Sequence, residues 1–268
     1  MANSTNKTKR TTKGSAAPAP RRMADVTPER RHALSTARGS TSTLAEMLTV
    51  DLGTLAQTLA PGVAPVAVAA LREGGFVTRL ALAGKAVFEH AGPRRAQGVF
   101  DRLAAHQSDM ARAVACFMIT ADEGLNLKER LARTRPLADD AHSGVREWAW
   151  MAVRPAIAAE LESAIKRLIP WTTEASPNLR RFASEATRPR GVWCAHLRQL
   201  RDNPAPGAAI LEPLRADPHK YVQDSVGNWL NDAGKDRPEW VSKLCRRWQR
   251  ESDSAFTARI VRRAMRNL

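Results

Sequence analysis

Apolar residues recur three and four positions apart along most of the chain after Ser40. The stretch TSTLAEMLTVDLGTLAQTL, residues 41–59, begins with helix-capping Ser and Thr and ends before Pro61 and Gly62. Residues 64–90 carry two more short helical patterns. Because no run of alternating β-branched residues occurs in the chain, the pattern predicts an all-α fold with essentially no sheet.

One pattern repeats at a fixed interval in the middle of the chain. The segments ARAVA, VREWA and LRRFA align so that Arg112, Arg146 and Arg180 stand 34 residues apart. An Arg-Pro pair recurs at the same interval in the second and third copies, and a fourth copy fits VQDSV, residues 222–226, after a longer spacer. Two helices per repeat of this length are typical of α-solenoids, and short loops with Pro exits favour HEAT-like pairs.

A solenoid of this kind is stable only as a stack, because one hairpin cannot bury its apolar face alone. We therefore expect a single HEAT-like repeat domain over residues 41–268. The second helices of the hairpins should line a concave groove, and the many arginines in this part of the chain predict that the groove is basic.

Residues 1–40 read as a basic N-terminal tail without apolar periodicity. They hold nine basic residues against two acidic ones. Two interpretations stay open: a solvated, disordered extension, or an arm that grips DNA without sequence preference.

Composition favours a polyanionic partner. The chain carries 42 Lys and Arg against 27 Asp and Glu, a formal net charge of +15, and nucleic acid is the commonest polyanion. No run of 18 apolar residues occurs, so no membrane span is expected. The three cysteines form no CxxC pair and the histidines share no ligand spacing, so we expect buried thiols in a reducing cytoplasm and no metal.

The stretch from Arg180 to Asp232 holds the candidate chemistry. Two predicted second helices each carry a carboxylate near a large aromatic residue: Glu185 before Trp193, and Asp232 after Trp229. We expect these helices, with the one around Trp150, to form one wall of the groove.

Three motifs resemble those of a known family. LADDAHSGVREWAWMAVRP, RRFASEATRPRGVW and SVGNWLNDAGKDRPEWV resemble the bacterial DNA alkylation repair proteins of the AlkC/AlkD group, and they are closer to the AlkC side. The resemblance covers roughly residues 40–268. It implies a HEAT-like DNA glycosylase that releases N3- or N7-alkylated purines from double-stranded DNA. We expect it to act as a monomer, without a cofactor and without the immunoglobulin-like domain that often follows in AlkC.

The resemblance also implies site residues. Glu185 and Asp232 match acidic positions of the AlkC pattern, whereas a third acidic position is occupied here by Trp150. The nearest carboxylate is Glu147, one helical turn earlier. Three alternatives follow: Glu147 substitutes, Glu185 and Asp232 suffice, or the protein binds DNA without catalysis.

Such an enzyme must stabilise an oxocarbenium-like sugar and position a water molecule, which a carboxylate near C1′ can do. Aromatic faces attract a cationic base, and arginines hold phosphates. The candidates for contact with substrate are Trp150, Trp193, Arg154, Arg188 and Arg190.

Other interpretations remain. Glu185 could simply pair with Arg181 or Arg188 at helical spacing, and Asp232 could cap a helix. The chain would then be a HEAT-like protein that binds distorted DNA without cutting, or a protein-binding solenoid, although its charge disfavours the latter. Carboxylates that face the groove unpaired would favour the enzyme, and carboxylates paired away from the groove would favour the binding protein.

Overall fold

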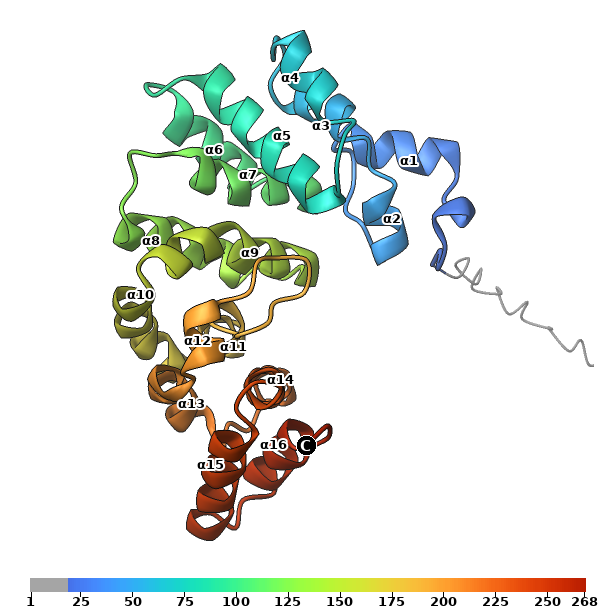
Figure 1. The fold of residues 1–268 in the computed structure, drawn as a ribbon. Coiled ribbons are helices and arrows are strands. Elements are labelled where there is room, and N and C mark those ends of the chain that lie inside the picture. Colours follow the sequence, from blue (N-terminus) through green and yellow to red (C-terminus); the bar gives the residue numbers. More distant parts are fainter. Residues whose placement is uncertain (1–18) are drawn as a thin grey trace, which may run out of the picture.

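The computed structural model describes residues 19–268, which form helices and no strand (Figure 1). The first helices are α1 (Pro28–Ser35), α2 (Leu44–Leu48), α3 (Leu52–Leu59), α4 (Pro65–Ala70), α5 (Phe76–Ala91), α6 (Ala96–Ala104), α7 (Asp109–Ala121) and α8 (Leu127–Ala138). They are followed by α9 (Ser143–Ala159), α10 (Leu161–Leu168), α11 (Pro177–Ala186), α12 (Arg198–Asp202), α13 (Ala208–Leu214), α14 (Lys220–Gly234), α15 (Pro238–Glu251) and α16 (Ala255–Ala264). Short 3-10 helices lie at Met23–Asp25, Ile169–Thr173 and Ala205–Gly207.

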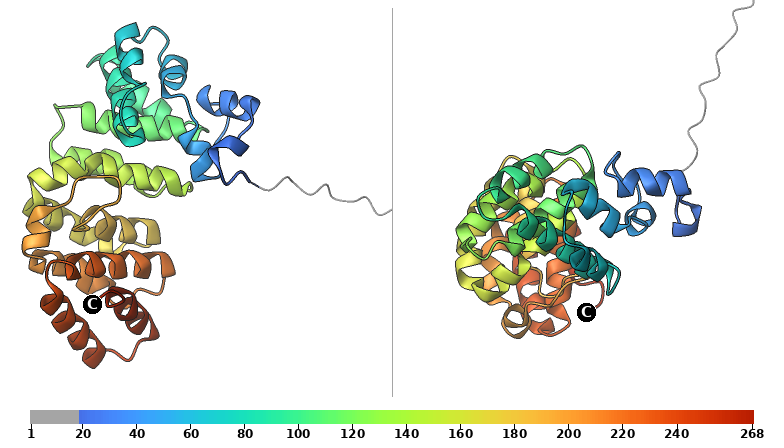
Figure 2. Two further views of the ribbon diagram at one scale, coloured as in Figure 1. Left: turned by 45° about the vertical axis from the view of Figure 1, so that its right-hand side comes forward. Right: turned by 90° about the horizontal axis from the view of Figure 1, so that it is seen from above.

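The helices stack as a series of hairpins in two rows, from the top of Figure 1 to the bottom, as the HEAT-like prediction requires. Helices α5, α7, α9, α11, α14 and α16 pack against one another in succession and form the inner row. Helices α6, α8, α10, α13 and α15 cover the other side of that row, along the left of Figure 1. Figure 2 shows the same stack from two further directions. The core lies between the rows, and the predicted solenoid is confirmed.

The repeating arginines hold this stack together. Arg112, Arg146 and Arg180 each donate to the backbone carbonyls six and five residues earlier, at 2.5–3.1 Å, and so fix the loop that precedes their own helix. Arg112 and Arg180 also pair with Asp140 and Asp217, which lie in the loop of the next repeat, at 2.7 and 2.6 Å. The 34-residue periodicity is therefore structural in origin.

In the fourth copy a different side chain makes the same hydrogen bond to the preceding loop. Helices α7, α9 and α11 begin at residues 109, 143 and 177, and α14 begins at residue 220, after the longer spacer. Gln223 stands at the arginine position and donates to the carbonyl of Asp217, six residues earlier, at 2.8 Å. The alignment of the four copies is thus physically meaningful.

The N-terminal boundary of the domain differs from the prediction. Pro28–Ser35 is a helix whose Thr27 cap accepts a hydrogen bond from the Arg30 backbone, and Leu34 is fully buried. Arg30 pairs with Glu46 of α2 at 2.7 Å. The predicted disorder up to residue 40 is therefore wrong for this segment, because a cap and one apolar anchor suffice to dock a short basic helix. The basic residues at positions 7–13 lie outside the described residues.

Two of the tryptophans belong to the core. Trp148 and Trp229 are 1% and 0% exposed. Over residues 19–268, no helix combines the length and the apolar character that crossing a bilayer requires.

Candidate functional site

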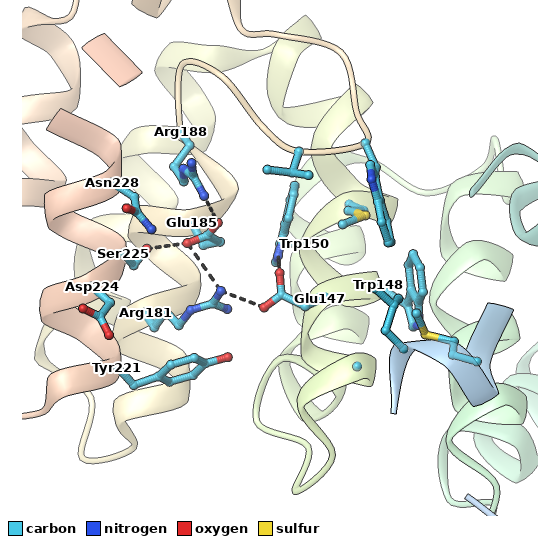
Figure 3. A pocket seen from close by; sticks show the side chains of 16 residues that line it. Glu147, Trp148, Trp150, Arg181, Glu185, Arg188, Tyr221, Asp224, Ser225 and Asn228 are labelled. Carbon is cyan, nitrogen blue, oxygen red and sulfur yellow. Dashed lines mark hydrogen bonds and ion pairs between the residues drawn. The ribbon is translucent and has the colours of Figure 1, made fainter. Parts of the chain in front are cut away.

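A cleft of about 440 Å³ opens on the inner row, between α9, α11 and α14 (Figure 3). Its rim is completed by α2 and by the loop of residues 188–197, which follows α11. The lining includes five residues of the predicted site: Glu147, Trp150, Glu185, Arg188 and Trp193. The structure thus brings together residues that lie 46 positions apart in the chain.

Glu147 is the most accessible of the predicted carboxylates, with 34% of its side chain exposed. Its Oε2 accepts a hydrogen bond from the indole Nε1–H of Trp150 at 2.8 Å, because residues three apart on a helix share a face. Its Oε1 lies 2.7 Å from the Arg181 guanidinium, which comes from the next inner helix. Two partners from two helices therefore fix the carboxylate at the cleft.

Glu185 lies deeper and is more strongly neutralised. Its side chain is 4% exposed and contacts Arg188 at 2.6 Å and Arg181 at 3.4 Å, and it accepts a hydrogen bond from the Ser225 hydroxyl at 2.7 Å. Burial raises the pKa of this carboxyl, but the two guanidinium groups and the hydroxyl outweigh burial and hold it below its ordinary value. Glu185 is thus an ionised anchor for two arginines.

Arg181 connects the two acids. Its guanidinium lies between Glu147 and Glu185, and it stacks over the ring of Tyr221 at 4.2 Å from the ring centre (Figure 3). Tyr221 and Arg181 both line the cleft, and neither was among the predicted site residues. The available signal was weak: Arg181 stands four residues before Glu185, and Tyr221 is the only tyrosine of the chain.

Asp232 is not part of the cleft lining. It is 5% exposed and lies 2.8 Å from Arg188, with Lys235 at 3.8 Å. Burial raises the pKa of its carboxyl, and Arg188 opposes that rise only in part. Asp232 therefore acts on the cleft through Arg188, whose guanidinium joins it to Glu185.

Two of the predicted phosphate ligands have other roles. Arg154 is 2% exposed and donates to the carbonyls of Ala186, Arg188 and Ala195 at 2.5–3.0 Å. Arg190 forms a two-point pair with Asp236. The prediction that these arginines face phosphates is wrong for Arg154, which is buried, and Arg190 is already engaged by a carboxylate.

The two predicted aromatic contacts differ in exposure. Trp150 is 2% exposed, so its ring is a wall of the cleft and its N–H serves Glu147. Trp193 is 49% exposed and stands in the loop at the rim. Its indole is thus the one of the two that a large ligand can reach.

The floor of the cleft is not basic, in contrast to the prediction. Arg181 and Arg188 face three lining carboxylates, those of Glu147, Glu185 and Asp224. Two exposed cations lie beside the cleft: Lys235 is 3.8 Å from Asp232, and Arg266 is close enough to Asp232 for that carboxylate to act on its pKa.

The carboxylates are neither all unpaired in the groove nor all paired away from it. Glu147 and Glu185 are paired with arginines, yet both line the cleft, whereas Asp232 is paired outside it. An ordered carboxylate next to an accessible indole can stabilise a developing positive charge and orient a water molecule. Within residues 19–268 no cluster of His, Cys, Asp and Glu has the arrangement of a metal site.

Comparison with known proteins places these features in a family. Residues 78–268 match the family model described as DNA alkylation repair enzyme. The uncharacterized protein YhaZ of Bacillus subtilis (strain 168) is 38% identical over 97 residues, which are 36% of this chain and 27% of that protein.

Two solved structures share the fold. Alkylpurine DNA glycosylase AlkC of Pseudomonas fluorescens, bound to DNA containing an abasic site analog, superposes with a TM-score of 0.63 at 23% identity. That match covers 94% of this chain and 65% of AlkC. AlkD2 of Streptococcus mutans superposes with a TM-score of 0.59 at 19% identity, over 76% of this chain and 97% of AlkD2. The chain therefore spans less than two thirds of the length of YhaZ and of AlkC.

Proposed function

The chain belongs to the DNA alkylation repair enzyme family, and from this premise we propose that it hydrolyses the N-glycosidic bond of N3- or N7-alkylated purines in double-stranded DNA. The net charge of +15 favours a polyanionic substrate, and the AlkC structure contains DNA. No cofactor is needed, because an alkylated purine carries a positive charge and leaves as a neutral base.

The observation that carries the proposal is the placement of Glu147. Its carboxylate is accessible at the cleft, and Trp150 and Arg181 hold it in one orientation. Trp150 occupies the position at which the AlkC pattern has an acid, and its indole N–H fixes the acid one turn earlier. We assign to Glu147 the role of stabilising the oxocarbenium-like sugar and of taking a proton from the attacking water.

Glu185 and Asp232 act through their arginines. Glu185 orients Arg181 and Arg188, and Asp232 holds Arg188 from the other side. Glu185 thereby fixes the position of Arg181 against Glu147. Arg188, which both carboxylates hold, remains a candidate for contact with the phosphate next to the lesion. Trp193 is the aromatic group available to the cationic base.

The test is release of free base from alkylated duplex DNA. The full chain is incubated with DNA methylated to contain 3-methyladenine and 7-methylguanine, and the released bases are separated and quantified. We expect release by the native protein and a loss of roughly 100-fold or more in rate for Glu147→Gln, with DNA affinity retained. The matched control is Glu162→Gln on α10, whose side chain is 85% exposed.

One observation favours a second function. Asp232 is paired with Arg188 outside the cleft lining, as expected of a protein that binds distorted DNA without cutting it, although Glu185, also paired, lines the cleft. Intact binding to DNA with an abasic-site analogue, combined with no release of either methylated base, would replace the glycosylase by this binding function.

A further inference from the structure

The repeating arginine of the second copy differs from its neighbours in its outer contact. Arg112 and Arg180 each pair with an aspartate of the next loop. Within residues 19–268 Arg146 has no carboxylate partner, and Glu174, the acid of the next loop, pairs instead with an arginine of α8 at 2.7 Å. The Nε–H of Arg146 donates to the hydroxyl of Tyr221 at 3.3 Å, and its guanidinium lies 5.1 Å from the centre of that ring. A tyrosine of α14 thus takes the place of the aspartate.

The same ring also contacts the cation that joins the two acids of the cleft. Tyr221 is half-buried and lines the cleft, and the Arg181 guanidinium lies 4.2 Å from its ring centre (Figure 3). Helix α11, which carries Arg181, packs against both α9 and α14, so the ring reaches across α11 to the arginine of α9. The backbone of Tyr221 is fixed as well, because its N–H donates to Nδ1 of the His219 cap at 3.4 Å. One side chain therefore contacts cations from two neighbouring repeats.

A ring in this place stabilises Arg181 without competing for its carboxylates. An aromatic ring attracts a guanidinium through its π electrons, and more strongly where water is excluded. The Arg181 side chain is only 12% exposed, so this contact is largely desolvated. The planar guanidinium can stack on a ring while its N–H groups still meet carboxylates. Here those groups lie 2.7 Å from Glu147 and 3.4 Å from Glu185.

Such a hold on Arg181 becomes necessary once DNA enters the cleft. Phosphates accept strong two-point hydrogen bonds from arginine, so each phosphate near the cleft is a competing anion. An Arg181 that turned to a phosphate would leave Glu147 held by the Trp150 indole alone. Glu185 opposes this rotation from the helix of Arg181 itself, and the Tyr221 ring opposes it from the next inner helix.

We propose that Tyr221 is a positioning residue: its ring keeps the Arg181 guanidinium on Glu147 while DNA fills the cleft, and Arg146 holds the ring there. The role rests on the proposed function, because it assigns the chemistry to Glu147. The ring is required more than the hydroxyl, because the ring makes both cation contacts and the hydroxyl adds one hydrogen bond. A ring without the hydroxyl should therefore serve, and an aliphatic side chain should not.

The first test separates the rate of base release from DNA binding. Release of free base from methylated duplex is followed in a single turnover with excess protein, and DNA affinity is measured on undamaged duplex. We expect Tyr221→Leu to slow release at saturation about 10-fold, with an affinity within about 3-fold of the native value. Tyr221→Phe should keep release within about 3-fold of the native rate, because it retains the ring.

The second test needs no catalysis. The Trp150 indole N–H donates to Glu147 at 2.8 Å, so its resonance in a proton–nitrogen correlation spectrum reports on that carboxylate. With the protein bound to duplex containing a tetrahydrofuran abasic analogue, this peak should coincide in the native and Tyr221→Phe complexes. In the Tyr221→Leu complex its proton shift should move upfield, because the acceptor is no longer fixed. The peak is assigned by its loss in Trp150→Phe.

A control of the same kind lies in the other row of helices. Arg133 lies over the Phe100 ring of α6 at 5.9 Å from the ring centre, and neither residue lines the cleft. Phe100→Leu should lower the stability to urea but leave the release rate and the Trp150 peak unchanged. Should Tyr221→Leu lose its helical circular dichroism, Tyr221→Met takes its place with the same expectations, because an unbranched side chain suits a helix.

Release at the native rate by Tyr221→Leu, or an equal loss in Tyr221→Leu and Tyr221→Phe, would overturn the positioning role. No release of base by the native protein, combined with a Trp150 peak that only Tyr221→Leu displaces, would keep the hold on Glu147 and remove the glycosylase. A Trp150 peak that Tyr221→Leu leaves in place would remove the hold, whether or not base is released.

Discussion

At the scale of single residues, the cleft is organised by pairs of opposite charge that the sequence suggests only in part. The spacing of Arg181, Glu185 and Arg188 in the sequence predicts ion pairs, and both pairs form. Sequence reasoning could not find that Arg181 also reaches Glu147, because that contact joins two helices. It also could not decide whether Trp150 faces DNA, since burial depends on the packing of neighbouring helices.

The substitution Glu185→Gln tests how much this buried network contributes to the stability of the fold. The substitution leaves Arg181 and Arg188 without a full counter-charge in a site that is almost closed to water, and breaking a buried pair typically costs about 3–5 kcal/mol. We expect that loss in the free energy of unfolding measured by urea denaturation. Glu162→Gln, at an exposed pair on α10, should leave it nearly unchanged. Equal effects of the two substitutions on the free energy of unfolding would show that the buried network contributes no more to stability than the exposed pair.

Asp232 illustrates the limit of a motif. The motif WLND predicted a carboxylate at the correct helix, α14, but could not show that the side chain turns toward Arg188 and away from the cleft lining. Residue type and spacing fix the helix on which a group lies, whereas the partners on neighbouring helices decide where its charge is used.

At the scale of helices, the sequence predicted most of what the structure contains. The 34-residue interval gave the starts of α7, α9 and α11, because each helix follows a loop that the repeating arginine closes. Helix α1 was missed, since its apolar content is a single buried leucine among charged residues. Its docking depends on Glu46, which no local pattern around α1 reveals.

The docking of α1 should depend on pH. Hydrogen bonds from Arg30 and Ser42 lower the pKa of Glu46 from about 4.5 to about 2, although burial opposes them. The stabilisation is therefore fully present above pH 4.5 and is lost as the pH falls from 4.5 toward 2. We expect the difference in unfolding free energy between the native protein and Glu46→Gln to shrink by roughly 1–3 kcal/mol over that window. A difference that stays constant in urea titrations across these pH values would contradict the assignment.

Close packing of α5 on α7 depends on one small residue. A Cβ at Gly84 would lie 2.5 Å from the Cβ of Phe117 and 2.7 Å from its backbone carbon, so the two helices would have to separate. We expect Gly84→Ala to lower the free energy of unfolding by about 1–3 kcal/mol. Gly98→Ala on α6 is the matched control, because nothing lies within 4 Å of its added Cβ, and it should stabilise by about 0.5–1 kcal/mol. In thermal unfolding, a melting temperature that falls for Gly84→Ala and rises for Gly98→Ala would confirm the difference.

At the scale of the whole molecule, the exposed positive charges and the cleft occupy different places on the inner row. The floor of the cleft balances arginines against carboxylates, while exposed cations such as Lys235 and Arg266 lie beside it on the inner row. Net charge alone predicted a polyanionic partner, but it could not predict where on the surface the positive charge would lie. Most arginines of the described residues fix loops or pair with acids. Phosphate contacts must then come from the minority that stay exposed.

This distribution makes a prediction about salt. If the inner row binds duplex DNA, the logarithm of the binding constant falls linearly with the logarithm of the salt concentration, with a slope of about −0.9 for each neutralised phosphate. Lys235→Ala and Arg266→Ala should each make the slope shallower by about 0.9, because each removes one cation beside the cleft. Lys166→Ala on α10, whose lysine is 70% exposed in the other row, should leave the slope unchanged. Fluorescence anisotropy with undamaged duplex at several salt concentrations measures all four proteins. A slope altered by Lys166→Ala but not by the inner-row substitutions would place the DNA on the opposite side of the solenoid, far from Glu147, and the proposed catalysis would then lack its substrate.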